Sequence, residues 1–176
     1  MLPIPDPLHP AIVHFPIALA VLVPALALAV LVAIRAGWVP ARTWLAVVVL
    51  QAAIVGFAWF AMETGEEQEE KVEKVVAERH IKAHEEAAER FLYIAIAATL
   101  VSAAGLLQGG RGRAARAATL VAGLAVLAAS VAVGHSGGEL VYKYGAASAY
   151  TDTASGSPGA GAPASAIRAP DTEAGE

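Results

Sequence analysis

The residues of this chain best suited to chemistry are its histidines, because the sequence contains no cysteine. Neutral imidazole binds haem iron, copper and zinc, and nearby carboxylates can orient the ring. Without cysteine, thiolate zinc sites, iron–sulfur clusters, disulfides and covalent c-type haem attachment within the chain are excluded. The five histidines are His9, His14, His80, His84 and His135.

Two of these histidines stand four residues apart. His80 and His84 lie one turn apart on a helical segment, a spacing that can chelate a single metal ion. The pair is not a metalloprotease signature, because Glu85 follows the second histidine rather than the first. A structural role on a surface helix is the simpler alternative for this pair.

The other three histidines lie near the ends of apolar segments. His14 falls in the second turn of an apolar stretch, where a polar side chain is costly without a partner. His135 falls at the expected end of the last apolar stretch, where an imidazole can interact with the helix dipole. His9 precedes Pro10 and can cap a helix. Each therefore has a structural alternative to ligation, a hydrogen bond or a cap.

The elements that carry these histidines are apolar helices. The chain is 57% hydrophobic and 16% charged, whereas a soluble domain carries about 25% charged residues. A membrane-spanning helix needs about 20 apolar residues. The sequence predicts an all-α fold, a four-helix transmembrane bundle with spans at about 11–34, 43–62, 91–108 and 116–134.

A polar segment separates the second and third spans. Residues 66–90 are rich in Glu, Lys and Arg and lack Gly and Pro, which predicts an amphipathic extramembrane helix. His80 and His84 continue the row of Val72 and Val76 at steps of four, so both should face the packed side. Residues 1–146 are predicted to form one membrane domain, and residues 147–176, rich in Ser, Gly, Ala and Pro, a disordered tail.

Glycine, proline and tryptophan give further expectations. The apolar pattern of the second span ends at Gly65, the fourth helix should end within 134–138, and Pro16 and Pro24 should kink the first span. Trp44 and Trp59 are expected at the membrane interfaces. The small residues expected to allow close helix approach are Gly56, Gly105 and Gly123.

Four crossings place all five histidines on one side of the membrane. Residues 1–10, 63–90 and 134–176 share that side, and the two short loops lie on the other. The loops contain arginines and no Asp or Glu: Arg35, Arg42, Arg111, Arg113 and Arg116. Basic residues in short loops stay cytoplasmic, so both termini and the histidines are predicted to lie on the outer side.

The clustered histidines lead to one functional hypothesis and two alternatives. The first is a haem b site with a redox role, held by His14 with His84 or His135; a copper, iron or zinc ion held by the five histidines is the variant. Glu63, Glu85 and Glu86 could orient the ligands. The second is a non-catalytic membrane scaffold or partner subunit with structural histidines, in which the 66–90 helix docks another protein.

A transporter or proton-coupled protein is the third alternative. It is disfavoured, because no carboxylate or lysine interrupts a span. The net charge of −4 and the scattered basic residues give no basic patch for nucleic acid. Nucleic acid is therefore not an expected partner. The predicted spans imply a lipid bilayer as a partner, and the haem hypothesis implies a redox protein.

Short motifs at both ends of the membrane domain resemble the bacterial predicted membrane proteins called domain of unknown function 2231. They are Leu8-His9-Pro10, Val13-His14-Phe15-Pro16, the His80–His84 pair, and Gly134-His135-Ser136-Gly137-Gly138 with Leu140-Val141-Tyr142. The resemblance covers roughly residues 7–146. It implies a four-helix domain in a bacterial inner membrane. Relatives joined to cytochrome-c-like or Rieske-like domains imply electron transfer.

The resemblance also implies site residues, which are His9, His14, His84 and His135, together with His80. One departure concerns the closing Tyr-x-x-Gly, near which the family implies a histidine and this chain has Tyr144. If relatives use a ligand there, it is missing here. The 176 residues also contain no fused redox domain.

Overall fold

The computed structural model describes residues 8–150, and every element within them is helical. In chain order the elements are α1 (His9–Ile12), α2 (His14–Arg35), the 3-10 helix η1 (Ala41–Trp44), α3 (Leu45–Val72), α4 (Glu78–Ala104), α5 (Gly109–Tyr142) and the 3-10 helix η2 (Ala146–Tyr150). Four of these helical stretches are long and apolar enough to cross a membrane. The predicted all-α four-helix transmembrane bundle is confirmed.

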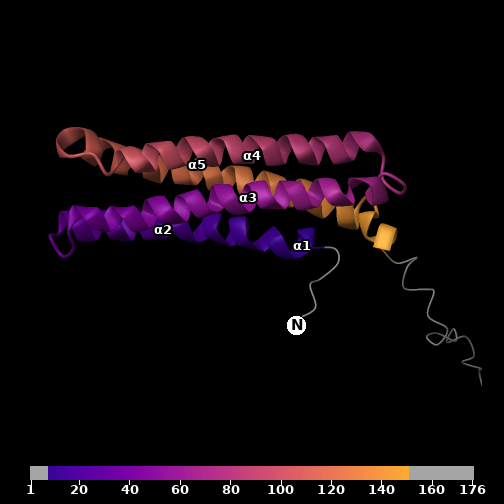
Figure 1. Ribbon diagram of the computed structural model, residues 1–176, viewed down its shortest axis with the longest axis horizontal. Coiled ribbons are helices and arrows are strands. Elements are labelled where there is room, and N and C mark those ends of the chain that lie inside the picture. The colour runs from indigo at the N-terminus through magenta and orange to yellow at the C-terminus, as the bar shows by residue number, and fades with distance from the viewer. Residues whose placement is uncertain (1–7, 151–176) are drawn as a thin grey trace, which may run out of the picture.

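The long helices form an antiparallel bundle with short connections (Figure 1). Helix α2 packs on α3 and α5, and α4 packs on α3 and α5, so each long helix contacts two neighbours. This is the up-down-up-down arrangement of a four-helix bundle. One end holds α1, the α3–α4 turn and the last turns of α5, and the opposite end holds the α2–α3 and α4–α5 connections. Below these are called the histidine end and the arginine end.

Small and branched side chains fill the interior of the bundle, whereas large apolar side chains cover its outside. The core is built from Ala20, Val23, Ala27, Leu31, Trp44, Val47, Ile54, Ala58, Phe91, Ala95, Ala98 and Val126. Outward-facing side chains such as Leu22, Leu100 and Val121 are each more than 60% exposed. A soluble protein rarely exposes so much apolar surface. Lipid tails are the environment in which this surface is stable.

Two of the three glycines predicted to permit close helix approach do so. A Cβ on Gly123 of α5 would lie 3.2 Å from the Pro24 ring of α2. A Cβ on Gly105 would overlap Trp44 Nε1. The prediction is wrong for Gly56, whose missing Cβ would meet nothing within 4 Å. Helix contact in lipid therefore depends on Gly123 and Gly105.

Replacing Gly123 by leucine is expected to destabilise the bundle by about 1–3 kcal/mol, the usual cost of overpacking a well-packed core. The added side chain would separate α2 from α5, because Pro24 is rigid and cannot rotate out of the way. Thermal unfolding in detergent would measure the change. The matched control is Gly56→Leu, which places the same side chain in open space. Equal destabilisation by both variants would contradict the role given to Gly123.

Proline affects the first span at one predicted position only. Helix structure is interrupted at Val13, between α1 and α2, three residues before Pro16. Pro16 has no N–H to continue the ladder there, and the next bond, from Ile17 N to Val13 O, is long at 3.4 Å. Pro24 lies inside α2 without interrupting it.

The polar segment 66–90 differs from its prediction as a single helix. Residues up to Val72 continue α3, residues from Glu78 begin α4, and a turn at 73–77 joins them. The turn is held by a small apolar cluster in which Val76, Ile81 and Ala146 are buried. The polar extension is thus a helical hairpin that prolongs the bundle beyond the apolar spans.

Three further expectations are corrected. The segment 134–138 does not end the fourth helix, since α5 runs to Tyr142, and α3 continues past Gly65 to Val72. Trp44 is fully buried, whereas Trp59 is exposed as expected of an interfacial indole, and so is Trp38. Residues 147–150, assigned to the tail, belong to η2, and the predicted disorder of 151–176 lies outside the described residues.

Candidate functional site

The five histidines all lie in the half of the bundle that contains its histidine end. Only two of them both form a hydrogen bond to another helix through a ring nitrogen and pack closely against a glycine of that helix. These two are His9 on α1 and His84 on α4. His80 stacks on another ring, and His14 and His135 are exposed. The site is therefore built from His9 and His84.

His9 is held against α3 by its Nδ1 atom. That nitrogen lies 2.8 Å from the backbone carbonyl oxygen of Ala61. A carbonyl only accepts hydrogen bonds, so Nδ1 carries the proton and donates it. In the neutral ring the Nε2 atom then bears the lone pair. Thr64 Oγ1, 3.4 Å from Nδ1, donates its own proton to helix carbonyls at 3.0 and 3.1 Å.

His84 has the same tautomer for a different reason. Its Nδ1 lies 2.8 Å from Ser136 Oγ of α5. The hydroxyl has one proton, which Ser136 donates to the Val133 carbonyl at 3.0 Å. Ser136 therefore accepts the Nδ1 proton of His84. The Nε2 lone pair of His84 is left for another partner, as it is in His9.

Each imidazole ring is seated over a glycine of the neighbouring helix. A Cβ on Gly65 would lie 3.2 Å from His9 Cε1, and a Cβ on Gly137 would lie 3.1 Å from His84 Cε1. Any larger residue would push the ring away. Gly65 and Gly137 thus leave space for the rings, and neither residue ends its helix.

The site favours neutral imidazoles. His9 and His84 lie in the first two turns of their helices, before the apolar stretches that begin near 11 and 91. Burial lowers the pKa of His9, and the hydrogen bond to Ala61 opposes this only in part. Burial lowers the pKa of His84, and the charge of His9 lowers it further. A proton on His9 would therefore disfavour a proton on His84.

His80 contacts a different neighbour from His84. Its ring lies flat on that of Tyr144, with centroids 3.7 Å apart and planes at 16°. Its Nε2 accepts a hydrogen bond of 3.2 Å from Arg79 Nε. The structure thus directs the two histidines of the predicted chelating pair to different neighbours, Tyr144 and Ser136.

His14 and His135 lie on the outer surface of the bundle. His14 is exposed beside Phe15, whose ring stacks on Phe57 at 5.0 Å. His135 is exposed and lines a shallow groove with Glu139 and Tyr142. Both side chains therefore face lipid, water or a partner.

The carboxylates expected to orient the ligands do not hydrogen-bond to the rings. Glu63 and Glu86 are exposed, and Glu86 pairs with Arg90 at 2.7 Å. Burial and the nearby Glu69 raise the pKa of Glu85, which faces other carboxylates rather than an imidazole. A backbone carbonyl and a serine hydroxyl take the orienting role instead.

Sequence reasoning missed the residues that fix the rings: Ala61, Thr64, Gly65, Ser136 and Gly137. A signal was present for part of this set, since Thr-Gly and Ser-Gly each follow an apolar run. A backbone carbonyl gives no such signal, because every residue has one.

The donor set suits some ligands better than others. Among residues 8–150, no group of three or more His, Asp or Glu side chains is placed to hold a metal ion. A structural zinc site takes four protein ligands and a catalytic one takes three. A haem iron would need only two protein ligands, because the macrocycle supplies the others.

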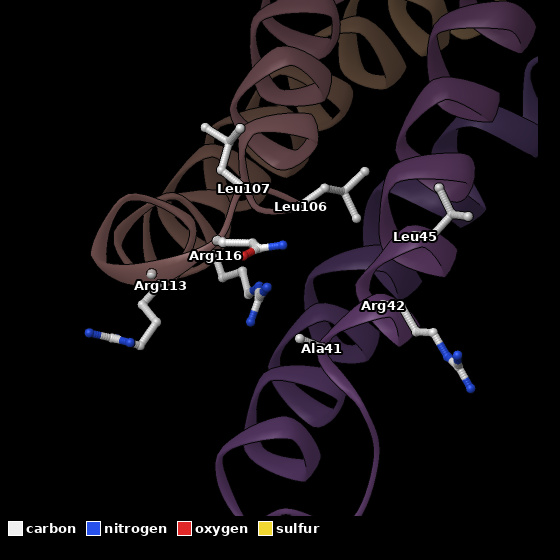
Figure 2. A pocket seen from close by; sticks show the side chains of 9 residues that line it. Ala41, Arg42, Leu45, Leu106, Leu107, Arg113 and Arg116 are labelled. Atoms are coloured by element: carbon white, nitrogen blue, oxygen red, sulfur yellow. The ribbon is translucent and has the colours of Figure 1, made fainter.

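The arginine end holds a second feature, a pocket of about 540 Å³ between the α2–α3 and α4–α5 connections (Figure 2). It is lined by Ala41, Arg42, Leu45, Leu106, Leu107, Gln108, Gly109, Arg113 and Arg116. The pocket lies at the opposite end of the bundle from His9 and His84. It has no part in a histidine site.

Comparison with protein families gives one match. The model of the family described as "Predicted membrane protein (DUF2231)" matches residues 5–149, which include α1 to α5 and all but the last residue of η2. No curated protein and no solved structure matches the chain.

Proposed function

We propose, from the premise that this chain belongs to the DUF2231 family of predicted membrane proteins, that its histidine end binds a haem b through His9 and His84. The observation that carries the proposal is the contact of each ring with the protein through Nδ1, at 2.8 Å in both cases, from which we infer that Nδ1 is the donor. Ligating histidines generally have this arrangement, with the second ring nitrogen bonded to a carbonyl or another acceptor. It leaves two neutral Nε2 donors from different helices.

The number of donors favours haem over the alternatives. Two imidazoles complete the coordination of a haem iron, whereas copper, iron or zinc ions without a macrocycle would need further ligands from water or a partner. When bound, a haem supplies one-electron chemistry. At the end of the bundle a redox partner protein could approach it, and in the predicted orientation that end is the outer face of a bacterial inner membrane.

The chain's own residues would supply orientation and a suitable electrostatic environment. Ala61 and Ser136 hold the rings in one tautomer, and Gly65 and Gly137 let them lie close to the helices. The lowered pKa values of His9 and His84 keep the rings neutral as the pH falls. Because a protonated imidazole cannot ligate, these shifts extend ligand binding to more acidic pH.

The test is an absorption spectrum of the full chain, purified in detergent from a haem-replete host. A Soret band is expected, and His9→Ala and His84→Ala should each abolish it. The matched controls are His14→Ala and His135→Ala, exposed histidines in the same half of the bundle, which should keep the band. Loss in the controls instead would support the ligand set predicted from sequence.

A second function is favoured by the same hydrogen bonds. His9 links α1 to α3 and His84 links α4 to α5. In this second function the two histidines bind no ligand and only stabilise a scaffold or partner subunit. In that case protein from the replete host has no Soret band and no bound copper, iron or zinc. The alanine variants then lower the unfolding temperature without any spectral change, a result that rules out the haem proposal.

A further inference from the structure

We infer that the pocket at the arginine end binds the phosphate headgroup of an anionic phospholipid, with Arg116 as its buried anchor. The site is independent of the histidines, because it lies at the other end of the bundle. Its lining combines arginine side chains with leucines, which suits a phosphate and the acyl chains below it.

Arg116 is the central observation. Its side chain is only 7% exposed, although a charged group is rarely buried without a partner. Its Nε donates a 2.7 Å hydrogen bond to the Gly105 carbonyl at the end of α4, and its guanidinium lies 6.0 Å from the Trp44 ring. These contacts fix the group while leaving its terminal nitrogens for another acceptor.

Acidic side chains are missing from this half of the protein. The sequence has no Asp or Glu from 7 to 62 or from 91 to 138. The four ion pairs found among residues 8–150 all lie toward the histidine end, between residues 70 and 143: Lys74–Glu70, Lys82–Glu78, Arg90–Glu86 and Lys143–Glu139. Among residues 8–150 no carboxylate pairs with Arg116, which leaves its charge for an anion from outside the protein.

The surroundings select a lipid as the source of that charge. Figure 2 shows Arg116 directed into the space between the two connections, while Arg42 and Arg113 extend from its two sides. Leu45, Leu106 and Leu107 line the same pocket and are 42–53% exposed. A free anion has no apolar group to pack against these leucines, whereas a phospholipid has both a phosphate and acyl chains. Basic pockets between helices at this depth bind anionic headgroups in other membrane proteins.

The experiment exposes the detergent-purified full chain to an equimolar mixture of phosphatidylglycerol and phosphatidylcholine and counts retained lipids by native mass spectrometry. Preferential retention of phosphatidylglycerol is expected. The double variant Arg42→Gln/Arg113→Gln should weaken that preference by roughly thirtyfold, since each arginine near a headgroup contributes roughly fivefold. Arg116→Gln should abolish it.

The control carries the same change in charge at the same end. Arg35→Gln/Arg111→Gln removes two exposed arginines that do not line the pocket and should keep the preference. Equal retention of the two lipids by the unmodified chain, or an equal loss in both double variants, would overturn the proposal. Should Arg116→Gln fail to fold, the two double variants still decide the question.

Inorganic phosphate distinguishes the two sources of the anion. Millimolar phosphate should not displace bound phosphatidylglycerol, because it cannot replace the contacts of the acyl chains with the leucines. Full displacement, with protection of the lipid-free protein against heat by phosphate alone, would assign the pocket to a soluble anion and refute the lipid.

Discussion

Trp44→Ala is expected to lower the free energy of unfolding by about 3 kcal/mol, the low end of the range for deleting a buried aromatic side chain. The low end applies because lipid rather than water surrounds the bundle and part of the transfer term is absent. Trp44 is the largest fully buried side chain, and its Nε1 donates a 2.9 Å hydrogen bond to the Ser102 carbonyl. Its loss leaves a cavity where α2, α3 and α4 meet the arginine end.

Trp38→Ala is the control for Trp44→Ala. Trp38 lies six residues earlier in the same connection and is 77% exposed, so its removal should change stability by less than about 0.5 kcal/mol. Trp44→Phe should fall between, because it keeps most of the volume and loses the hydrogen bond, at a cost of about 1 kcal/mol. Unfolding titrations in mixed detergent would measure all three. Similar losses for Trp38→Ala and Trp44→Ala would show that Trp44 is not a packing centre.

The fold could be predicted from sequence because its strongest determinant is local. Runs of apolar residues of the right length specify spans without any knowledge of neighbours. Helix ends were less accessible, because a glycine can end a helix or let another chain approach it. Gly65 and Gly137 have the second role, which only His9 and His84 across the interface reveal.

The sequence could predict at which end of the bundle the candidate site lies, but not which histidines form it. An even number of spans gathers all five histidines in one half, and the spacing of His80 and His84 gives a shared helix face. Rotation of each helix about its axis decides which rings meet. That rotation depends on packing between helices, so His14, the strongest ligand on sequence, lies outside and His9 lies inside.

The two ends of the bundle solve the problem of buried polar groups in opposite ways. At the histidine end, neutral rings are satisfied by a carbonyl and a hydroxyl of neighbouring helices. At the arginine end, a permanent cation contacts one carbonyl and the Trp44 ring, and no carboxylate among residues 8–150 pairs with it. The rings at the first end are hydrogen-bonded without any ligand, whereas the cation at the second end is the basis of the proposed anion site. Changes at Gly137 and at Arg116 should therefore affect different properties.

Gly137→Val is expected to destabilise the chain by about 2–3 kcal/mol and to remove any ligand bound by His84. The new Cβ would start 3.1 Å from His84 Cε1, and the branched side chain adds two methyl groups beyond it. The ring must then leave its seat, which breaks the 2.8 Å bond to Ser136. This change removes no imidazole, so it separates the position of the ring from its mere presence.

The matched control is Gly138→Val, one residue further along α5, where the added Cβ meets nothing within 4 Å. Valine has the same helix propensity at both sites, so the difference in unfolding temperature reports the contact with His84 alone. If the haem proposal holds, Gly137→Val should lose the Soret band and Gly138→Val should retain it. If His84 only stabilises the contact between α4 and α5, the two variants differ in stability and neither has a Soret band. Indistinguishable stability would show that the ring over Gly137 is not part of the folded core at all.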